Sequence, residues 1–197
     1  MTQKAFKLGN ELSQRHEGFS ERLDRLLEIH MQSLPNYGPY WHKHSMNTMR
    51  VEAASRFIYY QELYKKIIDV PGVICEFGVQ YGSTLSTLIN LRSIYEPFNY
   101  SRRIYGFDTF EGLANTTGVD GDLASDGDYA VTNGFENTLE EILALLEAES
   151  PMAHIRKFKL IKGDATKTVD TWLEENPHAI VSMCIFDMDI YEPTRQV

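Results

Sequence analysis

The sequence has few of the features that mark secreted, membrane or nucleic-acid-binding proteins. It contains only two cysteines, Cys75 and Cys184, each in an apolar strand-like run, so we expect reduced core thiols rather than a disulfide or a metal pair. No stretch approaches the roughly 18 apolar residues of a membrane span, and the first residues lack the apolar segment of a signal peptide. These absences predict a soluble, cytoplasmic protein.

Basic residues are also scarce. The 197 residues include 19 Lys and Arg against 28 Asp and Glu, which gives a formal net charge of -9. Nucleic acids and anionic membranes both select clustered positive charge, so neither is an expected partner, and a small-molecule substrate is expected instead. A hydrophobic share of 43% can bury one substantial core, which predicts one domain plus an appendage.

Two regions differ in their pattern of apolar residues. Residues 1–70 are polar and helix-like, with apolar positions at helical spacing, and predict an N-terminal helical cap. In residues 71–197, strand-like runs alternate with helical segments, which predicts an α/β fold with a parallel sheet covered by helices on both faces. The predicted strands lie at 73–75, 103–108, 158–162 and 179–189. Before the third strand, Thr138-Leu139-Glu140-Glu141 resembles a helix capping box.

The most informative segment follows the first predicted strand and reads Glu76-Phe77-Gly78-Val79-Gln80-Tyr81-Gly82-Ser83-Thr84. It predicts a strand end, a tight turn and a helix start. Gly78 would let a ligand lie against bare backbone, and Gly82 would let the helix begin closely packed against the sheet. The phosphate-binding patterns G-x-G-x-x-G and G-x-x-x-x-G-K-[ST] are both absent from the sequence. The pattern E-x-G-x-x-x-G suits a phosphate-free ligand with an ammonium and a sulfonium, such as S-adenosylmethionine, and a plain structural turn is the alternative.

Acids end the other predicted strands. Asp108 stands where a nucleoside-binding fold needs a carboxylate for the ribose hydroxyls, and capping of the next loop is its alternative role. Asp164 could meet an exocyclic amine such as adenine N6, while N-capping of a helix by Asp164 or Thr166 is equally consistent. Alternation along a strand would put Asp187 and Asp189 on one side, about 7 Å apart, where they could share a cation or a substrate. Because open α/β sheets bind ligands beyond the carboxyl ends of their strands, these acids predict one site.

Three sequence blocks, taken together and in their order along the chain, resemble the macrocin O-methyltransferase family over roughly residues 46–197. They are Val70-Pro71-Gly72-Val73-Ile74-Cys75-Glu76-Phe77-Gly78-Val79 with Gly82-Ser83, then Phe107-Asp108-Thr109-Phe110-Glu111-Gly112-Leu113, then Asp187-Met188-Asp189-Ile190-Tyr191-Glu192-Pro193-Thr194. The resemblance implies a Rossmann-like class I methyltransferase fold. It also implies a magnesium-assisted transfer of methyl from S-adenosylmethionine to a hydroxyl of a small molecule, often on a sugar of a natural product.

The resemblance assigns roles by position. Glu76, Gly78 and Gly82 match residues that line the methionine part of the cofactor, while Asp108 matches the ribose ligand and Asp164 the adenine ligand. Asp187 matches the metal ligand, and Asp189 matches the proposed general base. With neighbouring residues added, the predicted cofactor-binding set is Glu76, Gly78, Tyr81, Gly82, Ser83, Asp108, Thr109, Gly163, Asp164 and Asp187. The resemblance also suggests a homo-oligomer.

The sequence ends directly after the third block, at Val197. The family's fold continues through further strands and supplies a downstream acidic pair to the metal, so we expect a truncated chain with an incomplete magnesium site. Two alternatives to an active O-methyltransferase follow. One is a catalytically incomplete fragment that binds S-adenosylmethionine or serves in assembly, and the other is a nucleotide-dependent oxidoreductase on a similar sheet.

A segment rich in glycine and aspartate, residues 112–134, has no role in these motifs. Asp120, Asp122, Asp126 and Asp128 miss the spacing of a calcium-binding loop, and no Glu occupies the twelfth position of that template. Long connections without regular structure are often functional, so we predict a mobile lid over the substrate.

Overall fold

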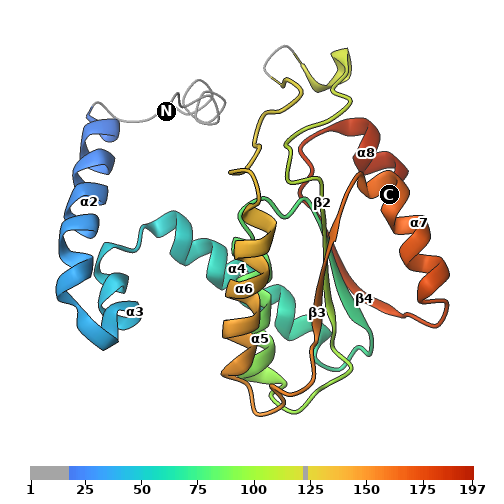
Figure 1. The fold of residues 1–197 in the computed structure, drawn as a ribbon, viewed down its shortest axis with the longest axis horizontal. Coiled ribbons are helices and arrows are strands. Elements are labelled where there is room, and N and C mark those ends of the chain that lie inside the picture. The colour runs from blue at the N-terminus through green and yellow to red at the C-terminus, as the bar shows by residue number, and fades with distance from the viewer. Residues whose placement is uncertain (1–17, 122–123) are drawn as a thin grey trace. The chain divides into compact units, whose positions relative to one another are not determined.

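A computed structural model describes residues 18–121 and 124–197 (Figure 1). The chain divides between Tyr59 and Tyr60 into two compact units. The division falls inside helix α4 (Val51–Ile67), which therefore contributes to both units. The boundary that the sequence pattern places at residue 70 lies just beyond the end of the same helix.

The N-terminal unit is built from short helices. They are α2 (Phe19–Ser33), η1 (Leu34–Asn36), η2 (Gly38–Tyr40), α3 (Trp41–His44), η3 (Ser45–Thr48) and the first part of α4. Prolines stand in the first turns of η1 and η2, where the missing N–H costs no helical hydrogen bond. None of residues 18–59 is buried, and large apolar side chains such as Met46 and Val51 are exposed. This described part of the chain therefore has no core of its own.

The C-terminal unit contains a four-stranded parallel sheet. Its strands are β1 (Val73–Phe77), β2 (Ile104–Asp108), β3 (Phe158–Lys162) and β4 (Val181–Phe186), in the order β3-β2-β1-β4. Each neighbouring pair is parallel, and Phe77 of β1 is aligned with Phe107 of β2 and with Phe186 of β4. The carboxyl ends of β1, β2 and β4 therefore meet at one edge of the sheet.

Helices cover both faces of this sheet, as the sequence pattern predicts (Figure 1). On one face lie α4, α5 (Ser83–Tyr95) and α6 (Phe135–Ala148), and on the other lie α7 (Ala165–Glu175) and α8 (Tyr191–Gln196). Because side chains alternate along a strand, neighbouring residues of one strand enter different cores. Ile74 and Ile104 pack with α4, α5 and α6, while Cys75 and Tyr105 pack with Trp172 of α7.

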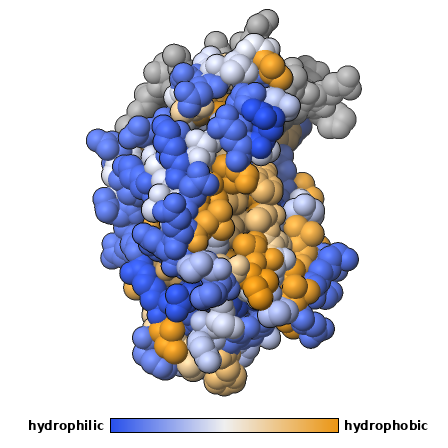
Figure 2. Space-filling model, turned by 90° about the vertical axis from the view of Figure 1, so that its right-hand side faces the viewer, coloured by the Kyte–Doolittle hydropathy of each residue, from blue (hydrophilic) through white to orange (hydrophobic). Residues whose placement is uncertain are grey.

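Strand β4 forms one edge of the sheet. Its side chains Val181 and Phe186 are 39% and 49% exposed, and Cys184 is also exposed, so only Cys75 is the core thiol that the sequence predicts. Apolar residues gather on the face of the molecule that Figure 2 shows. Within the described residues, the sheet therefore keeps an apolar edge open to solvent.

Two local predictions are wrong. The last strand ends at Phe186, not at Asp189, because Asp189 has a φ of +59° that a strand does not accommodate. Helix α6 begins at Phe135 after a left-handed Gly134, so Thr138 lies inside the helix and caps nothing. A further finding concerns membranes: no helix in the described ranges has both the length and the hydropathy to cross a bilayer.

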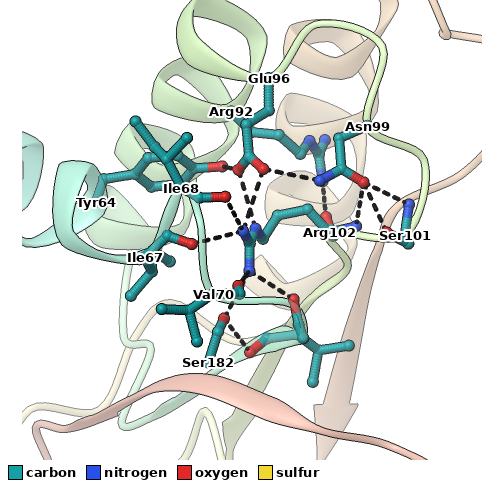
Figure 3. A network of polar contacts seen from close by, with 12 residues as sticks. Tyr64, Ile67, Ile68, Val70, Arg92, Glu96, Asn99, Ser101, Arg102 and Ser182 are labelled. Carbon is teal, nitrogen blue, oxygen red and sulfur yellow. Dashed lines mark hydrogen bonds and ion pairs between the residues drawn. The ribbon is translucent and has the colours of Figure 1, made fainter.

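Arg102, just before β2, is buried and joins several segments of the chain (Figure 3). Its Nη2 donates to Ile67 O at 2.8 Å, at the end of α4. Its Nη1 donates to Val70 O at 2.9 Å and to Gly72 O at 2.8 Å, before β1, and to Ser182 Oγ at 2.8 Å in β4. The guanidinium thus fixes the amino-terminal ends of two strands and the end of a helix.

Glu96 balances the buried charge of Arg102. Arg102 Nε donates to Glu96 Oε2 at 2.9 Å, and Tyr64 OH donates to the same oxygen at 2.6 Å. Burial acts to raise the pKa of Glu96, but the hydrogen bonds from Arg102, Tyr64 and Asn99 outweigh it and hold that pKa below its ordinary value. The carboxylate is therefore charged, and the buried pair is satisfied on both sides.

A second buried ionic group links α5, α6 and the start of β3. Arg92 Nη2 pairs with Glu147, and Lys157 Nζ lies 3.2 Å from the same carboxylate. The Lys157 backbone N–H also donates to Glu147 Oε2 at 2.9 Å. Both ionic groups lie at the amino-terminal ends of the strands, whereas the predicted site lies at their carboxyl ends.

We expect Arg102→Met to lower the free energy of unfolding by about 3–5 kcal/mol, the usual cost of removing one partner of a buried ion pair. The substitution removes the cationic partner of Glu96 and the side-chain donor to the carbonyls of Ile67 and Val70. Urea unfolding followed by circular dichroism measures the change. Arg195→Met is the matched control, because its pair with Glu192 is exposed, and it should cause no resolvable change. Equal stability of Arg102→Met and the parent would contradict this account.

Candidate cofactor and catalytic site

The turn between β1 and α5 packs directly against the end of β4. Gly78 has a φ of +92°, and a Cβ at this position would lie 2.1 Å from Asp187 O. The Gly78 N–H donates to Phe107 O at 3.0 Å, and the Asp187 N–H donates to Phe77 O at 2.8 Å. Glycine at position 78 therefore allows the backbone beyond β4 to approach the turn, which brings Asp187 close to the predicted cofactor loop.

Gly82 starts α5 as its N-cap in the left-handed conformation, with a φ of +75°. A Cβ here would lie 2.3 Å from Leu139 Cδ1, so the close neighbour is helix α6 rather than the sheet. The Gly82 N–H donates to Val79 O at 2.8 Å and closes the turn. Ser83, another predicted cofactor residue, is then the first residue of the helix.

The Asp108 carboxylate bridges the loops that follow β1 and β2. Its Oδ2 accepts from the N–H groups of Val79 at 2.5 Å and Gln80 at 2.8 Å, and its Oδ1 accepts from the N–H of Phe110 at 2.5 Å. Gln80 and Phe110 both have positive φ, at 50° and 59°. The carboxylate therefore holds two strained loops in place. A carboxylate has about four acceptor positions, so with three N–H groups bound about one position is left for a ribose hydroxyl.

Asp164 is the N-cap of α7, which was one of its two predicted roles. Its Oδ1 accepts from Thr166 N at 3.1 Å and from Thr166 Oγ1 at 2.7 Å, and Lys167 Nζ lies 3.2 Å from Oδ2. The Thr166 hydroxyl, followed by Lys167, holds the pKa of Asp164 below its ordinary value despite partial burial. The preceding Gly163 donates its N–H to Asp108 O at 2.9 Å. The β3 and β2 loops are therefore also joined.

Three other predicted cofactor residues lie around these loops. Glu76 is buried in β1, with 1% of its surface exposed. Tyr81 is 49% exposed at the turn. Thr109 Oγ1 donates to Gly112 O at 3.0 Å and thereby shapes the loop after β2. The predicted residues thus belong to the ends of β1, β2, β3 and β4 and to the loops that follow.

Asp187 and Asp189 lie in the segment between β4 and α8, and both are exposed. The sequence predicts that both lie on one side of a strand, about 7 Å apart. That prediction does not apply, because the strand has already ended and Asp189 is left-handed. Enough protein surrounds the Asp189 carboxylate to raise its pKa, and the negative charge of Asp187 raises it further. The two carboxylates therefore lie close enough to interact.

A metal site of three or more ligating side chains is not formed by the described residues. This holds for groups of His, Cys, Asp and Glu side chains in residues 18–121 and 124–197. Asp187 and Asp189 can therefore provide only part of a protein-based metal site here.

The structure relates Tyr129 to Asp189 through the pKa of its phenol, which the sequence did not predict. Partial burial raises the pKa of its phenol, and the charges of Asp189 and then Asp128 raise it further. Tyr129 has a φ of +63° and follows the aspartate-rich loop. No motif surrounds it, so only the folded structure could show its proximity to Asp189.

The aspartates described in residues 112–134 accept hydrogen bonds from the protein itself. Asp126 Oδ1 accepts from Thr116 N at 2.9 Å and Thr116 Oγ1 at 2.8 Å, and Asp128 Oδ2 accepts from Ser125 N at 2.9 Å. Asp122 lies outside the described residues. These side chains explain the aspartate content without a calcium ion.

The close approach at Gly78 gives a stability prediction. Gly78→Ala and Gly127→Ala both place alanine at a positive φ, +92° and +85°, and each pays about 1–2 kcal/mol of backbone strain. Only Gly78→Ala also drives a Cβ into Asp187 O, since nothing lies within 4 Å of a Cβ at Gly127. Urea unfolding should therefore show a clearly larger loss for Gly78→Ala. Equal losses in the two variants would mean that the backbone near Asp187 moves away freely.

The solved structures that are similar to this chain include two of CalS11. The first, described as calicheamicin methyltransferase, has a TM-score of 0.90 and 34% sequence identity, and the alignment covers 95% of this chain and 74% of CalS11. The second is an apo structure described as TDP-rhamnose 3'-O-methyltransferase, an enzyme in calicheamicin biosynthesis. It has a TM-score of 0.80 and 31% identity over the same shares of the two chains. No protein-family model and no curated protein matches the chain.

The identity, the coverage and the fold agree with one another. A parallel sheet in the order β3-β2-β1-β4, with helices on both faces, is the Rossmann-like arrangement of a methyltransferase. Dinucleotide-binding oxidoreductases share this strand order, so it is the 34% identity to CalS11 that favours a methyltransferase over the oxidoreductase alternative. The chain belongs to the class I S-adenosylmethionine-dependent methyltransferases, and it is an O-methyltransferase.

Proposed function

We propose that this O-methyltransferase transfers methyl to a hydroxyl of a sugar, that a nucleotide-linked deoxysugar such as TDP-rhamnose is its acceptor, and that the acceptor is deprotonated by Asp189. The main support for this proposal is the 34% identity, over 95% of the chain, to CalS11, an enzyme described as TDP-rhamnose 3'-O-methyltransferase. The narrower assignment to a macrocin-type enzyme rests on the three sequence blocks alone.

The cofactor would lie across the carboxyl ends of β1, β2 and β3. In this proposal Glu76, Gly78 and Gly82 line the methionine part, Asp108 receives the ribose hydroxyls and Asp164 lies near adenine. The bonds from Val79 and Gln80 to Asp108 support this arrangement, because they fix the first loop relative to the ribose ligand. The proposed set also includes Tyr81, Ser83, Thr109 and Gly163 in the same loops, and Asp187 after β4.

The reaction is an in-line displacement at the methyl carbon. The acceptor oxygen forms the new C–O bond, the C–S bond breaks, and the sulfonium leaves as a neutral thioether. The hydroxyl proton goes to the Asp189 carboxylate. A raised pKa makes Asp189 a stronger base than an ordinary carboxylate, and alignment of the acceptor can supply about 7–11 kcal/mol in favourable systems.

Magnesium assistance is compatible with the side chains after β4. Mg²⁺ prefers oxygen ligands and usually keeps several waters beside one or two carboxylates and the substrate. Asp187 is an exposed carboxylate next to the proposed base, so it is the residue that would bind the ion. A bound Mg²⁺ would orient the acceptor hydroxyl and lower its pKa. In this proposal Asp187 alone would bind the ion, and Asp189 stays free to accept the hydroxyl proton.

Calorimetric titration of S-adenosylmethionine and S-adenosylhomocysteine, with and without Mg²⁺, tests the cofactor site. We expect micromolar affinity, about -8 kcal/mol, and its loss in Asp108→Ala, which removes the ribose ligand and frees the first loop. Asp170→Ala, an exposed acid of α7, is the control and should bind like the parent. Parent-like binding by Asp108→Ala would exclude the ribose role, and no binding by the folded parent would exclude the site.

Methylation of TDP-rhamnose, followed by mass spectrometry, tests the base. Asp189→Asn should reduce turnover about 10²–10⁴-fold while leaving cofactor affinity nearly unchanged, because the amide cannot accept the proton. Asp170→Asn is the matched control and should keep parent turnover. Unchanged turnover in Asp189→Asn would remove it from the base role. Cofactor binding without any methyl transfer would favour the alternative of a catalytically incomplete fragment.

A further inference from the structure

The loop that follows β2 is closed at its neck by backbone hydrogen bonds. Leu113 N donates to Asp128 O at 2.8 Å, and Gly127 N donates to Leu113 O at 2.8 Å. Between these two contacts the chain forms a loop that no part of the cofactor site requires. Its neck leads to Tyr129, which directly follows Asp128 in the chain.

Asp120 lies in this loop and makes two kinds of contact. Its Oδ2 accepts from Thr117 N at 2.7 Å and Thr117 Oγ1 at 2.9 Å, within a capping box of the short helix η4 (Gly118–Asp120). Its Oδ1 accepts from the backbone N–H of Tyr191 at 2.6 Å, a residue 71 positions further along the chain. One oxygen therefore shapes the loop, and the other holds a distant segment.

The segment that Asp120 holds carries the proposed base. Tyr191 is the first residue of α8, two positions after Asp189. Ile190, the N-cap residue, supplies no side-chain hydrogen bond to the helix, so the first N–H of α8 is bound by Asp120 instead. Ile190 is itself buried, with 6% of its surface exposed. The left-handed Asp189 is therefore followed, two positions later, by Tyr191, whose backbone is held by Asp120.

We propose that Asp120 is a positioning residue for methyl transfer, because it fixes the backbone that carries Asp189 through the hydrogen bond from Tyr191 N–H. This inference rests on the proposed function, in which Asp189 is the base. A hydrogen bond to a charged carboxylate is stronger than a neutral one. A small displacement of a catalytic group, even from a distant change, can cost large factors in rate.

Two substitutions break this hydrogen bond from opposite ends. Asp120→Ala removes the acceptor. Tyr191→Pro removes the donor, and proline fits there because the position is the first of a helix and Ile190 before it is extended, with φ -130° and ψ 147°. Tyr191→Ala removes the ring but keeps the N–H, which separates the two effects. Asp126→Ala is the matched control, because the hydrogen bonds of Asp126 with Thr116 stay within the loop.

The first measurement needs no acceptor. Hydrogen–deuterium exchange of the peptide covering residues 187–197 should become about tenfold faster in Asp120→Ala, because the segment loses its anchor. Asp126→Ala should exchange like the parent. Unchanged exchange in Asp120→Ala, or equally fast exchange in Asp126→Ala, would overturn the anchoring role.

The second measurement is turnover with TDP-rhamnose. We expect kcat to fall about tenfold or more in Asp120→Ala and Tyr191→Pro, with no further fall in the double variant, while the Kd for S-adenosylhomocysteine stays at the parent value. Asp120→Asn keeps one acceptor oxygen for Tyr191 N–H and should recover most of kcat. A parent-like kcat in Asp120→Ala, despite faster exchange, would overturn the positioning role. If the parent itself does not methylate TDP-rhamnose, the proposed acceptor is wrong, and the exchange experiment alone decides whether Asp120 holds the segment.

Discussion

The guanidinium of Arg102 is the contact on which the amino-terminal edge of the sheet depends. The chain enters β1 from the end of α4, and a helix end leaves carbonyls without internal partners. Arg102 donates to Ile67 O and to Val70 O, and also to Ser182 Oγ in β4, while Glu96 supplies the opposite charge. A cation is favourable at a helix C-terminus, so one side chain satisfies the helix and aligns two strands.

At the carboxyl ends of the strands, a carboxylate instead of a guanidinium holds the backbone of neighbouring segments together. The loops that leave β1 and β2 present backbone N–H groups, and Asp108 accepts from three of them. Gln80, Phe110 and Asp189 each have a positive φ and follow β1, β2 and β4. Such strain persists only where the surroundings fix the backbone, and it concentrates at functional sites. The amino-terminal ends of the strands are thus held by buried ion pairs, while the strained backbone lies at their carboxyl ends, where the proposed site is.

The sequence predicts the strands of the sheet better than the points where strands end and helices begin. Strand β3 lies at the predicted residues 158–162, because an apolar run bounded by polar residues is a local signal. The end of β4 and the start of α6 were wrong, since a left-handed Asp189 and a left-handed Gly134 override the local pattern. Asp164 satisfied two patterns equally, and only the contact with Thr166 shows the cap.

Contacts between distant segments explain the rest of what the sequence could not show. The bond from Tyr191 N–H to Asp120 spans 71 positions, and the donor is backbone, so residue type at position 191 carries no trace of it. Asp108 likewise binds the N–H groups of Val79 and Gln80 whatever their side chains are. Because these carboxylates hold backbone, the side chains of the same loops remain available to contact an acceptor. Acceptor selectivity can therefore change in this fold while the geometry around the cofactor is kept.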